Sequence, residues 1–207
     1  MLTPSSSLRL QAGFLALLVG LLAAGCTHAS PKHSEACTTN VDSIAVATID
    51  VSDSRTSILA DSFANDQRDR ALSSQRQLTD AEWQEVEHGD DVRLAEAVRA
   101  LASPNSLSVR DLYYASVILL HGTCAEHYRL ARDLAERAMG LGVDEAKSIF
   151  ANATDRHLLS IDQPQKYGTQ YDCNAGDCTL LPYDLKTTDA ERIELDVPPM
   201  TEGRGGG

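Results

Sequence analysis

The sequence predicts an all-α domain of packed αα-hairpins, closed on its C-terminal side by a short disulfide-bonded loop or hairpin. Aromatic residues make up only 5% of the chain, whereas Ala and Leu are plentiful, and this composition favours helices over a β-sandwich. Apolar residues recur at helical spacing through the middle of the chain, between helix-capping signals. Near the C-terminus, Cys173 and Cys178 flank a strong turn sequence.

The first 25 residues are predicted to be an export signal and not part of the fold. Arg9 precedes an apolar run over residues 12–24, which is too short and too early for an ordinary membrane span. Small residues then lead directly into Cys26. This arrangement resembles the lipobox of bacterial lipoproteins, and the resemblance implies that Cys26 becomes the lipidated first residue of the mature chain. Ordinary signal cleavage, with Cys26 in a disulfide, is the alternative.

Three further segments follow from this interpretation. Residues 26–40 form the lipidated Cys and a polar tether, residues 41–197 the helical domain, and residues 198–207 a disordered tail. The residue after the lipidated Cys is Thr27 and not Asp. We therefore expect a lipid-anchored protein of the bacterial cell envelope, in the outer membrane and facing the periplasm.

The chain is strongly acidic, with 18 basic and 30 acidic side chains and a net charge of −12. Removal of residues 1–25 would take away Arg9 and no acid, so the mature chain is more negative still. Such a surface repels nucleic acid. The expected partners are the membrane, through the lipid anchor, and a protein of the cell envelope, with no nucleic acid.

Four cysteines remain after Cys26, and an even number in an exported chain predicts disulfides. Three pairings are possible. The turn sequence between Cys173 and Cys178 favours a bond between these two, which leaves Cys37 to pair with Cys124. Free thiols or a metal site are the alternative, but C-x4-C is not a usual zinc spacing. We expect no metal and no cofactor.

The N-terminal part of the domain contains one undecided segment and several predicted helices. Residues 41–51 are apolar and β-branched, and fit either a short strand or an early helix. Residues 57–75 follow a helical pattern. Thr79 and Glu82 form a capping box for a helix that we expect to end at His88, because Gly89 should break it before a second helix over residues 90–102.

The second half begins with a weaker capping box at Ser108 and a helix that is apolar on nearly all sides, as expected at the centre of a domain. Residues 134–146 and their neighbours are similar to the helix–turn–helix units of tetratricopeptide-like repeats, which implies packed helical hairpins. The predicted elements of this half are helices over residues 112–120, 125–139 and 144–159, a loop or hairpin around Cys173 and Cys178, and a final helical turn over residues 189–192.

Four polar motifs occur in order between residues 65 and 170. They are Asp-Gln-Arg-Asp-Arg from Asp66 to Arg70, a helix from Asp111 that leads to His121-Gly122, Asp-Arg-His-Leu from Asp155, and Gln-Lys-Tyr-Gly-Thr-Gln from Gln165 to Gln170. This order resembles a bacterial family of uncharacterised proteins, whose most specific motif is the last one. The resemblance implies no particular activity. The family usually has Gln where this chain has Leu120.

These polar residues have two interpretations, since the chain lacks the common hydrolase, metalloprotease and nucleotide-binding motifs. In the functional one, a cleft joins His121 as general acid or base with Asp155 and Arg156. The side chains that would bind the substrate are then Gln165, Tyr167, Gln170, Asp66 and Arg70. In the structural one, the same residues form a polar latch that fixes the C-terminal loop to the helices.

The leading hypothesis is therefore a periplasmic binding or scaffolding lipoprotein. It rests on the helical hairpins, the membrane anchor and the missing catalytic motifs. The alternative is a hydrolase or transferase that acts on an envelope component through a cleft of His121, Arg156 and Gln165.

Overall fold

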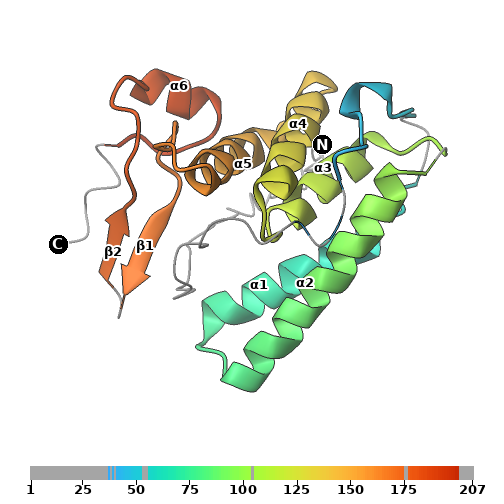
Figure 1. The fold of residues 1–207 in the computed structure, drawn as a ribbon, viewed down its shortest axis with the longest axis horizontal. Helices are drawn as coiled ribbons and strands as arrows, with labels where there is room; N and C mark the ends of the chain where they lie inside the picture. The colour runs from blue at the N-terminus through green and yellow to red at the C-terminus, as the bar shows by residue number, and fades with distance from the viewer. Residues whose placement is uncertain are drawn as a thin grey trace, which may run out of the picture.

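The computed structural model describes residues 37, 39, 41–52, 56–103, 105–174 and 177–200. The predicted export signal, Cys26 and nearly all of the tether lie outside these residues, as do residues 201–207 of the tail. Within the described residues the chain forms six α-helices, one short 3-10 helix and a two-stranded antiparallel hairpin (Figure 1). The elements are η1 Val46–Thr48, α1 Ala60–Gln75, α2 Asp80–Leu101, α3 Val109–Leu119, α4 Ala125–Gly140, α5 Ala146–Ser160, β1 Tyr171–Asn174, β2 Asp177–Leu180 and α6 Asp189–Glu194.

Helices α1 and α2 pack side by side and form one side of the molecule (Figure 1). The capping box at Thr79 is confirmed: its side chain accepts a hydrogen bond from the backbone N–H of Glu82, and the Glu82 carboxylate accepts one from Thr79. The predicted break at Gly89 is wrong, because α2 continues without interruption from Asp80 to Leu101. A glycine costs a helix only about 1 kcal/mol relative to Ala, which tertiary packing readily offsets.

The core lies where α3, α4 and α5 meet, with one face of α2 against them. Helix α3 is buried along most of its length, as its all-round apolar sequence predicts, and Ser108 and Asp111 form its capping box. Alanines let the neighbouring helices approach closely: Ala131, Ala135 and Ala138 of α4 are completely buried. Phe63 of α1 stacks on Tyr114, and these rings close the junction of α1 with α3.

The undecided segment at residues 41–51 contains the 3-10 helix η1 and ends in a single bridge between Val51 and Leu107. Arg137 of α4 holds this segment, since its guanidinium donates to the carbonyl oxygens of Val46 and Ile49. The predicted disulfide between Cys37 and Cys124 is present, and it fixes the chain ahead of η1 to the start of α4.

Strands β1 and β2 form the predicted C-terminal hairpin, in which Cys173 lies opposite Cys178 and is bonded to it. The hairpin and α6 lie at one end of the molecule, beyond α5 (Figure 1). Pro198 and Met200, which we assigned to a disordered tail, instead hydrogen-bond to α6. Arg192 donates to the Pro198 carbonyl, and the Met200 N–H donates to Asp189.

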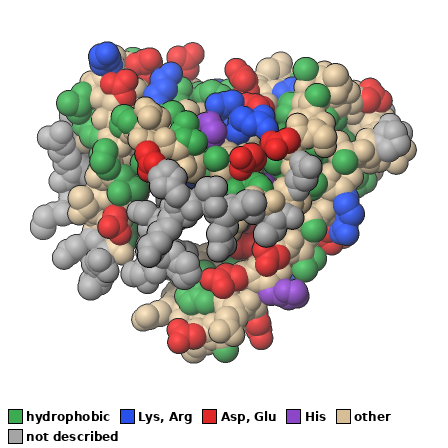
Figure 2. All heavy atoms as spheres, viewed as in Figure 1, with side chains coloured by type: hydrophobic (Ala, Val, Ile, Leu, Met, Phe, Trp, Pro, Cys, Tyr) green, Lys and Arg blue, Asp and Glu red, His purple; other side chains and the backbone are tan. Residues whose placement is uncertain are grey.

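Acidic side chains are spread over the face shown in Figure 2 and are interspersed with hydrophobic and basic ones, in keeping with the net charge of −12. Among the described residues, no helix combines the length and the apolar character needed to cross a bilayer.

Candidate functional site

The polar residues predicted from the sequence separate into two groups in the structure. Asp155, Gln165, Tyr167 and Gln170 meet where α5 contacts the loop before the hairpin. Asp66, Arg70 and His121 meet on the side of α1 and α2, and Arg156 is close enough to His121 to act on its charge. The two groups have different chemistry.

Asp155 holds the loop through four hydrogen bonds. Its Oδ1 accepts from the backbone N–H groups of Lys166 and Tyr167 at 2.7 and 2.8 Å. Its Oδ2 accepts from the N–H and the hydroxyl of Thr169 at 2.9 and 2.8 Å. The side chain is completely buried, and burial raises the pKa of the carboxyl while these hydrogen bonds oppose the rise. Asp155 is therefore a structural anchor for this loop, and in this arrangement both of its carboxylate oxygens are occupied by hydrogen bonds within the protein.

Gln165 ties the same loop to the hairpin. Its amide nitrogen donates to the carbonyl oxygens of Gln170 and Leu181, and its amide oxygen accepts from the N–H of Gln170. The residue has no exposed surface. The structure does not bring Gln165 together with His121, because the Gln165 amide is buried and bonded to the loop and the hairpin.

The rest of this motif also serves packing. The ring of Tyr167 is buried against Ala151 and Val197, so it presents no free face to a ligand. Gln170 donates to Asn152 of α5. Gly168 has a φ of +67°, and a side chain there would collide with Met200 and Arg192. The Gln-Lys-Tyr-Gly-Thr-Gln motif, with Asp155, is the latch of the structural interpretation.

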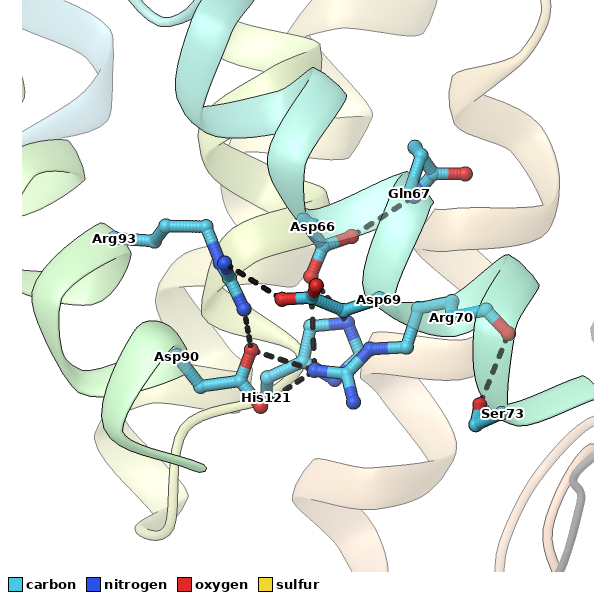
Figure 3. A network of polar contacts seen from close by, with 8 residues as sticks. All are labelled: Asp66, Gln67, Asp69, Arg70, Ser73, Asp90, Arg93 and His121. Carbon is cyan, nitrogen blue, oxygen red and sulfur yellow. Dashed lines mark hydrogen bonds and ion pairs between the residues drawn. The ribbon is translucent and has the colours of Figure 1, made fainter. Parts of the chain in front are cut away.

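The second group centres on Asp66 and His121. Asp66 comes from the middle of α1, and His121 follows the end of α3 (Figure 3). Nε2 of His121 lies 3.2 Å from Oδ1 of Asp66, and Oδ2 of Asp66 accepts a hydrogen bond from the Gln67 amide at 2.9 Å. The Asp66 side chain is 1% exposed and that of His121 is 23% exposed, so solvent reaches the imidazole but not the carboxyl.

Two arginines and two further acids surround this pair. Arg70 donates to both carboxylate oxygens of Asp90, and its guanidinium lies 3.6 Å from Asp66. Arg93 pairs with Asp90 at 2.6 Å and with Asp69 at 2.9 Å. Figure 3 shows these side chains from α1 and α2 converging on His121. Each of the two arginines is therefore neutralised by carboxylates.

The sequence analysis missed Asp90 and Arg93, because the expected break at Gly89 separated them from the helix before it. Gly89 has a different role. A side chain there would lie 3.0 Å from the Arg93 guanidinium, so the missing Cβ gives Arg93 room to lie along α2. The signal that could have found them is the spacing of Asp90 and Arg93, which places an acid and a base on the same helix face.

Arg156 differs from the other two arginines. The Nε atoms of all three are buried without a hydrogen-bond partner, but Arg70 and Arg93 form ion pairs with acids, and within the part of the chain that the structure describes no ion pair joins Arg156 to an acid. Its charge reaches His121, since it is one of the groups that lower the pKa of that imidazole. Arg156 is the positive charge of this cluster that lacks a carboxylate.

The electrostatics keep His121 neutral. Burial lowers the pKa of His121 well below its ordinary value, and the positive charges of Arg70, Arg156 and Arg93 lower it further. Burial raises the pKa of Asp66, while Arg70 and Gln67 counteract this rise. A neutral imidazole whose Nε2 faces Asp66 keeps Nδ1 for another partner, and the guanidinium of Arg156 is free to bind an anion.

We refer to Asp66, Arg70, Arg93, His121 and Arg156 together as the Arg–His cluster. Comparison with models of protein families, with characterised proteins and with solved structures finds no match to the chain.

Proposed function

We propose that the protein is a lipid-anchored binding module of the bacterial cell envelope, and that its Arg–His cluster receives an anionic group of a partner. The anchor is the predicted diacylglyceryl modification of Cys26, in the outer membrane and facing the periplasm. The packing of α4 against α3 and α5 supports an arrangement similar to tetratricopeptide-like hairpins, a scaffold that suits protein binding. We also propose that the chain belongs to the bacterial family that its polar motifs resemble.

The observation that carries this proposal is the uncompensated guanidinium of Arg156 beside a neutral, partly exposed His121. An arginine with a buried Nε and no carboxylate partner costs free energy unless something else binds it. The carboxylate or phosphate of a ligand supplies that partner, and guanidinium binds such groups in a bidentate way. The net charge of −12 repels anions that approach the protein. This repulsion is screened by salt, so an anion that contacts Arg156 directly can still bind, and the site selects anions that reach it at close range.

Site-specific photo-cross-linking in cells tests the proposal. Ser73 lies one helical turn beyond Arg70 on the same side of α1, and a photoreactive amino acid at this position borders the cluster (Figure 3). Leu185 is 81% exposed at the hairpin end and is the matched control position. We expect an adduct of defined mass from position 73 that is absent from position 185 and is lost when Arg156→Gln is added. An adduct that persists with Arg156→Gln contradicts the binding role of Arg156.

The anchor has a separate test. Metabolic labelling with an alkyne-bearing fatty acid should tag the wild-type chain, whereas Cys26→Ser should remove both the label and the membrane association. Label on the Cys26→Ser chain would show that the lipid is attached elsewhere.

A second candidate function is a hydrolase or transferase that acts on an envelope component with His121 as general base. The observation in its favour is that Nε2 of His121 lies 3.2 Å from Oδ1 of Asp66, outside hydrogen-bond geometry, and a small movement on substrate binding would let this carboxylate orient the neutral imidazole as a catalytic base. Arg156 would then bind the anionic substrate. Incubation of envelope extracts with wild type or His121→Asn, followed by mass spectrometry, separates the two candidates: products that form only with wild type indicate an enzyme, and identical extracts favour binding.

A further inference from the structure

A second group of reactive side chains lies at the start of α4, apart from the Arg–His cluster. Cys124 is the N-cap residue of α4, and His127 follows one turn later on the same helix. Cys37 comes from the segment before η1 and is bonded to Cys124. The two sulfur atoms and one ring nitrogen of His127 all lie within 4.8 Å of one another.

His127 has no role in the fold that the structure explains. The residue is 0% exposed, and neither ring nitrogen makes a hydrogen bond of acceptable geometry, although the ring faces the backbone of Thr39. Buried polar side chains are nearly always hydrogen-bonded, so a buried imidazole without such bonds requires an explanation. Leu or Met would fill the same space at no such cost.

The chain also makes room for this imidazole. A Cβ at Gly122 would overlap the ring of His127, so only glycine fits beside it. The His121-Gly122 motif thus serves two places: His121 enters the Arg–His cluster, and Gly122 admits the His127 ring next to the cysteines.

We propose that reduction of the Cys37–Cys124 disulfide opens a site for a thiophilic divalent cation of the Zn²⁺ class, with Cys37, Cys124 and His127 as ligands. Zinc binds sulfur at about 2.3 Å and imidazole nitrogen at about 2.0–2.1 Å, so donors around a tetrahedral ion lie roughly 3.5–4 Å apart. Donors that already lie within 4.8 Å reach these separations by small side-chain rotations. Two soft thiolates and an imidazole select zinc-like ions over Mg²⁺ or Ca²⁺.

The reaction is balanced by a dithiol reductant, such as an envelope protein with a thioredoxin-like cysteine pair. The reductant gives two electrons and two protons to the Cys37–Cys124 bond and itself becomes a disulfide. The cation then displaces the two thiol protons to solvent, and the two thiolates cancel its double charge.

Three protein ligands leave a fourth position for water or for an exchangeable ligand, as in catalytic zinc sites and unlike the closed four-ligand structural sites. In either state, the segment that joins the domain to its predicted anchor stays attached to α4, by the disulfide or by the metal. The site therefore takes up a cation without releasing the domain from its tether.

The test uses the full chain in detergent, as prepared and after anaerobic reduction by a phosphine, and titrates it with Co²⁺ and then with Zn²⁺ as competitor. We expect the reduced chain to bind one Co²⁺ with a thiolate charge-transfer band and the d–d absorption of a tetrahedral ion, which Zn²⁺ abolishes. The oxidised chain should show neither. His127→Gln should weaken binding at least about tenfold, since even the loss of an outer-shell partner costs 10–100-fold.

The second disulfide supplies the matched control. Cys173→Ser with Cys178→Ser should leave the cobalt spectrum unchanged, whereas Cys37→Ser with Cys124→Ser should remove the charge-transfer band. Absence of the band in the reduced wild type overturns the proposal, and so does its survival in the Cys37/Cys124 variant.

Zn²⁺ should also raise the melting temperature of the reduced wild type but not that of reduced His127→Gln. If reduction alone lowers the helical circular dichroism signal, Zn²⁺ should restore it in the wild type. A signal that Zn²⁺ does not restore would also contradict the proposed metal site.

Discussion

Removal of the Asp155 carboxylate should detach the loop before the hairpin. Asp155→Ala deletes the acceptor of four hydrogen bonds, three of them from the backbone N–H groups of Lys166, Tyr167 and Thr169. The Tyr167 N–H is buried and would keep no partner, which costs about 1–3 kcal/mol. Water reaches the partly buried donors of Lys166 and Thr169, so the loss of each of these hydrogen bonds costs only about 0.5–1.5 kcal/mol. We expect a loss of about 3–5 kcal/mol in the free energy of unfolding.

The assay is denaturant unfolding monitored by circular dichroism, with hydrogen exchange at the Tyr167 and Thr169 amides as a local readout. Glu136→Gln, an exposed neutral substitution on α4, is the control and should stay within about 0.5 kcal/mol. Asp155→Asn should lose less unfolding free energy than Asp155→Ala, because the amide oxygen still accepts the hydrogen bonds of one of the two carboxylate oxygens. A loss below about 1 kcal/mol for Asp155→Ala, with unchanged amide protection, would refute the anchoring role.

Three further predictions follow from the same contacts. Because the pKa of His121 is lowered in the folded protein, its neutral form supports the fold above the unfolded pKa of about 6.5, and stability falls as the pH drops below that value by at most about 1.4 kcal/mol per pH unit. His121→Gln should flatten this slope between pH 7.5 and 5, and an unchanged slope would contradict the shift. Asp66 acts in the opposite direction, since its raised pKa removes stability as the pH rises above about 3.9. Comparing wild type with His121→Gln at each pH isolates the contribution of His121 from that of Asp66. Gly122→Ala should lower the free energy of unfolding by about 1–3 kcal/mol, as calorimetry would show, because the added methyl displaces the His127 ring; an unchanged melting curve would deny that contact. Loss of the Cys37–Cys124 disulfide, which spans 87 residues, should cost about 4.5 kcal/mol against about 2 kcal/mol for the bond that spans 5 residues at Cys173, and equal losses in denaturant unfolding would contradict this ranking.

The parts of the fold that follow from local chemistry could be predicted from the sequence. The capping boxes at Thr79 and Ser108 form as expected, because both partners of each box lie within one helical turn. The all-round apolar helix before His121 lies in the core, since it has no polar face for solvent. Both disulfides follow from an even cysteine count and one strong turn.

The parts that depend on contacts between distant segments could not be predicted. Gly89 was interpreted as a helix break because glycine disfavours helices. It leaves room for Arg93, whose ion pair with Asp69 of α1 joins two helices and cannot be seen in the sequence around Gly89. The sequence identified the polar residues but could not assign each of them to the latch or to the Arg–His cluster. Asp155 and Arg156 are neighbours in the chain, yet Asp155 bonds to the loop of the latch, whereas the charge of Arg156 lowers the pKa of His121. Helical geometry places adjacent residues about 100° apart, so neighbours reach different surfaces.

Gln165 serves the fold, and we propose that Arg156 serves a ligand. The most direct measurement compares the melting temperatures of wild type, Gln165→Ala and Arg156→Gln in the absence of any partner. Gln165→Ala should melt several degrees lower, because it removes the acceptor of the partly buried Gln170 N–H and the donor to the Leu181 carbonyl, while the Gln170 carbonyl keeps the Leu181 N–H. Arg156→Gln should melt at the wild-type temperature or above it, as expected for a residue whose charge pairs with no acid among the described residues. A melting temperature of Arg156→Gln as low as that of Gln165→Ala would show that Arg156 belongs to the fold, and would contradict the binding site proposed around it.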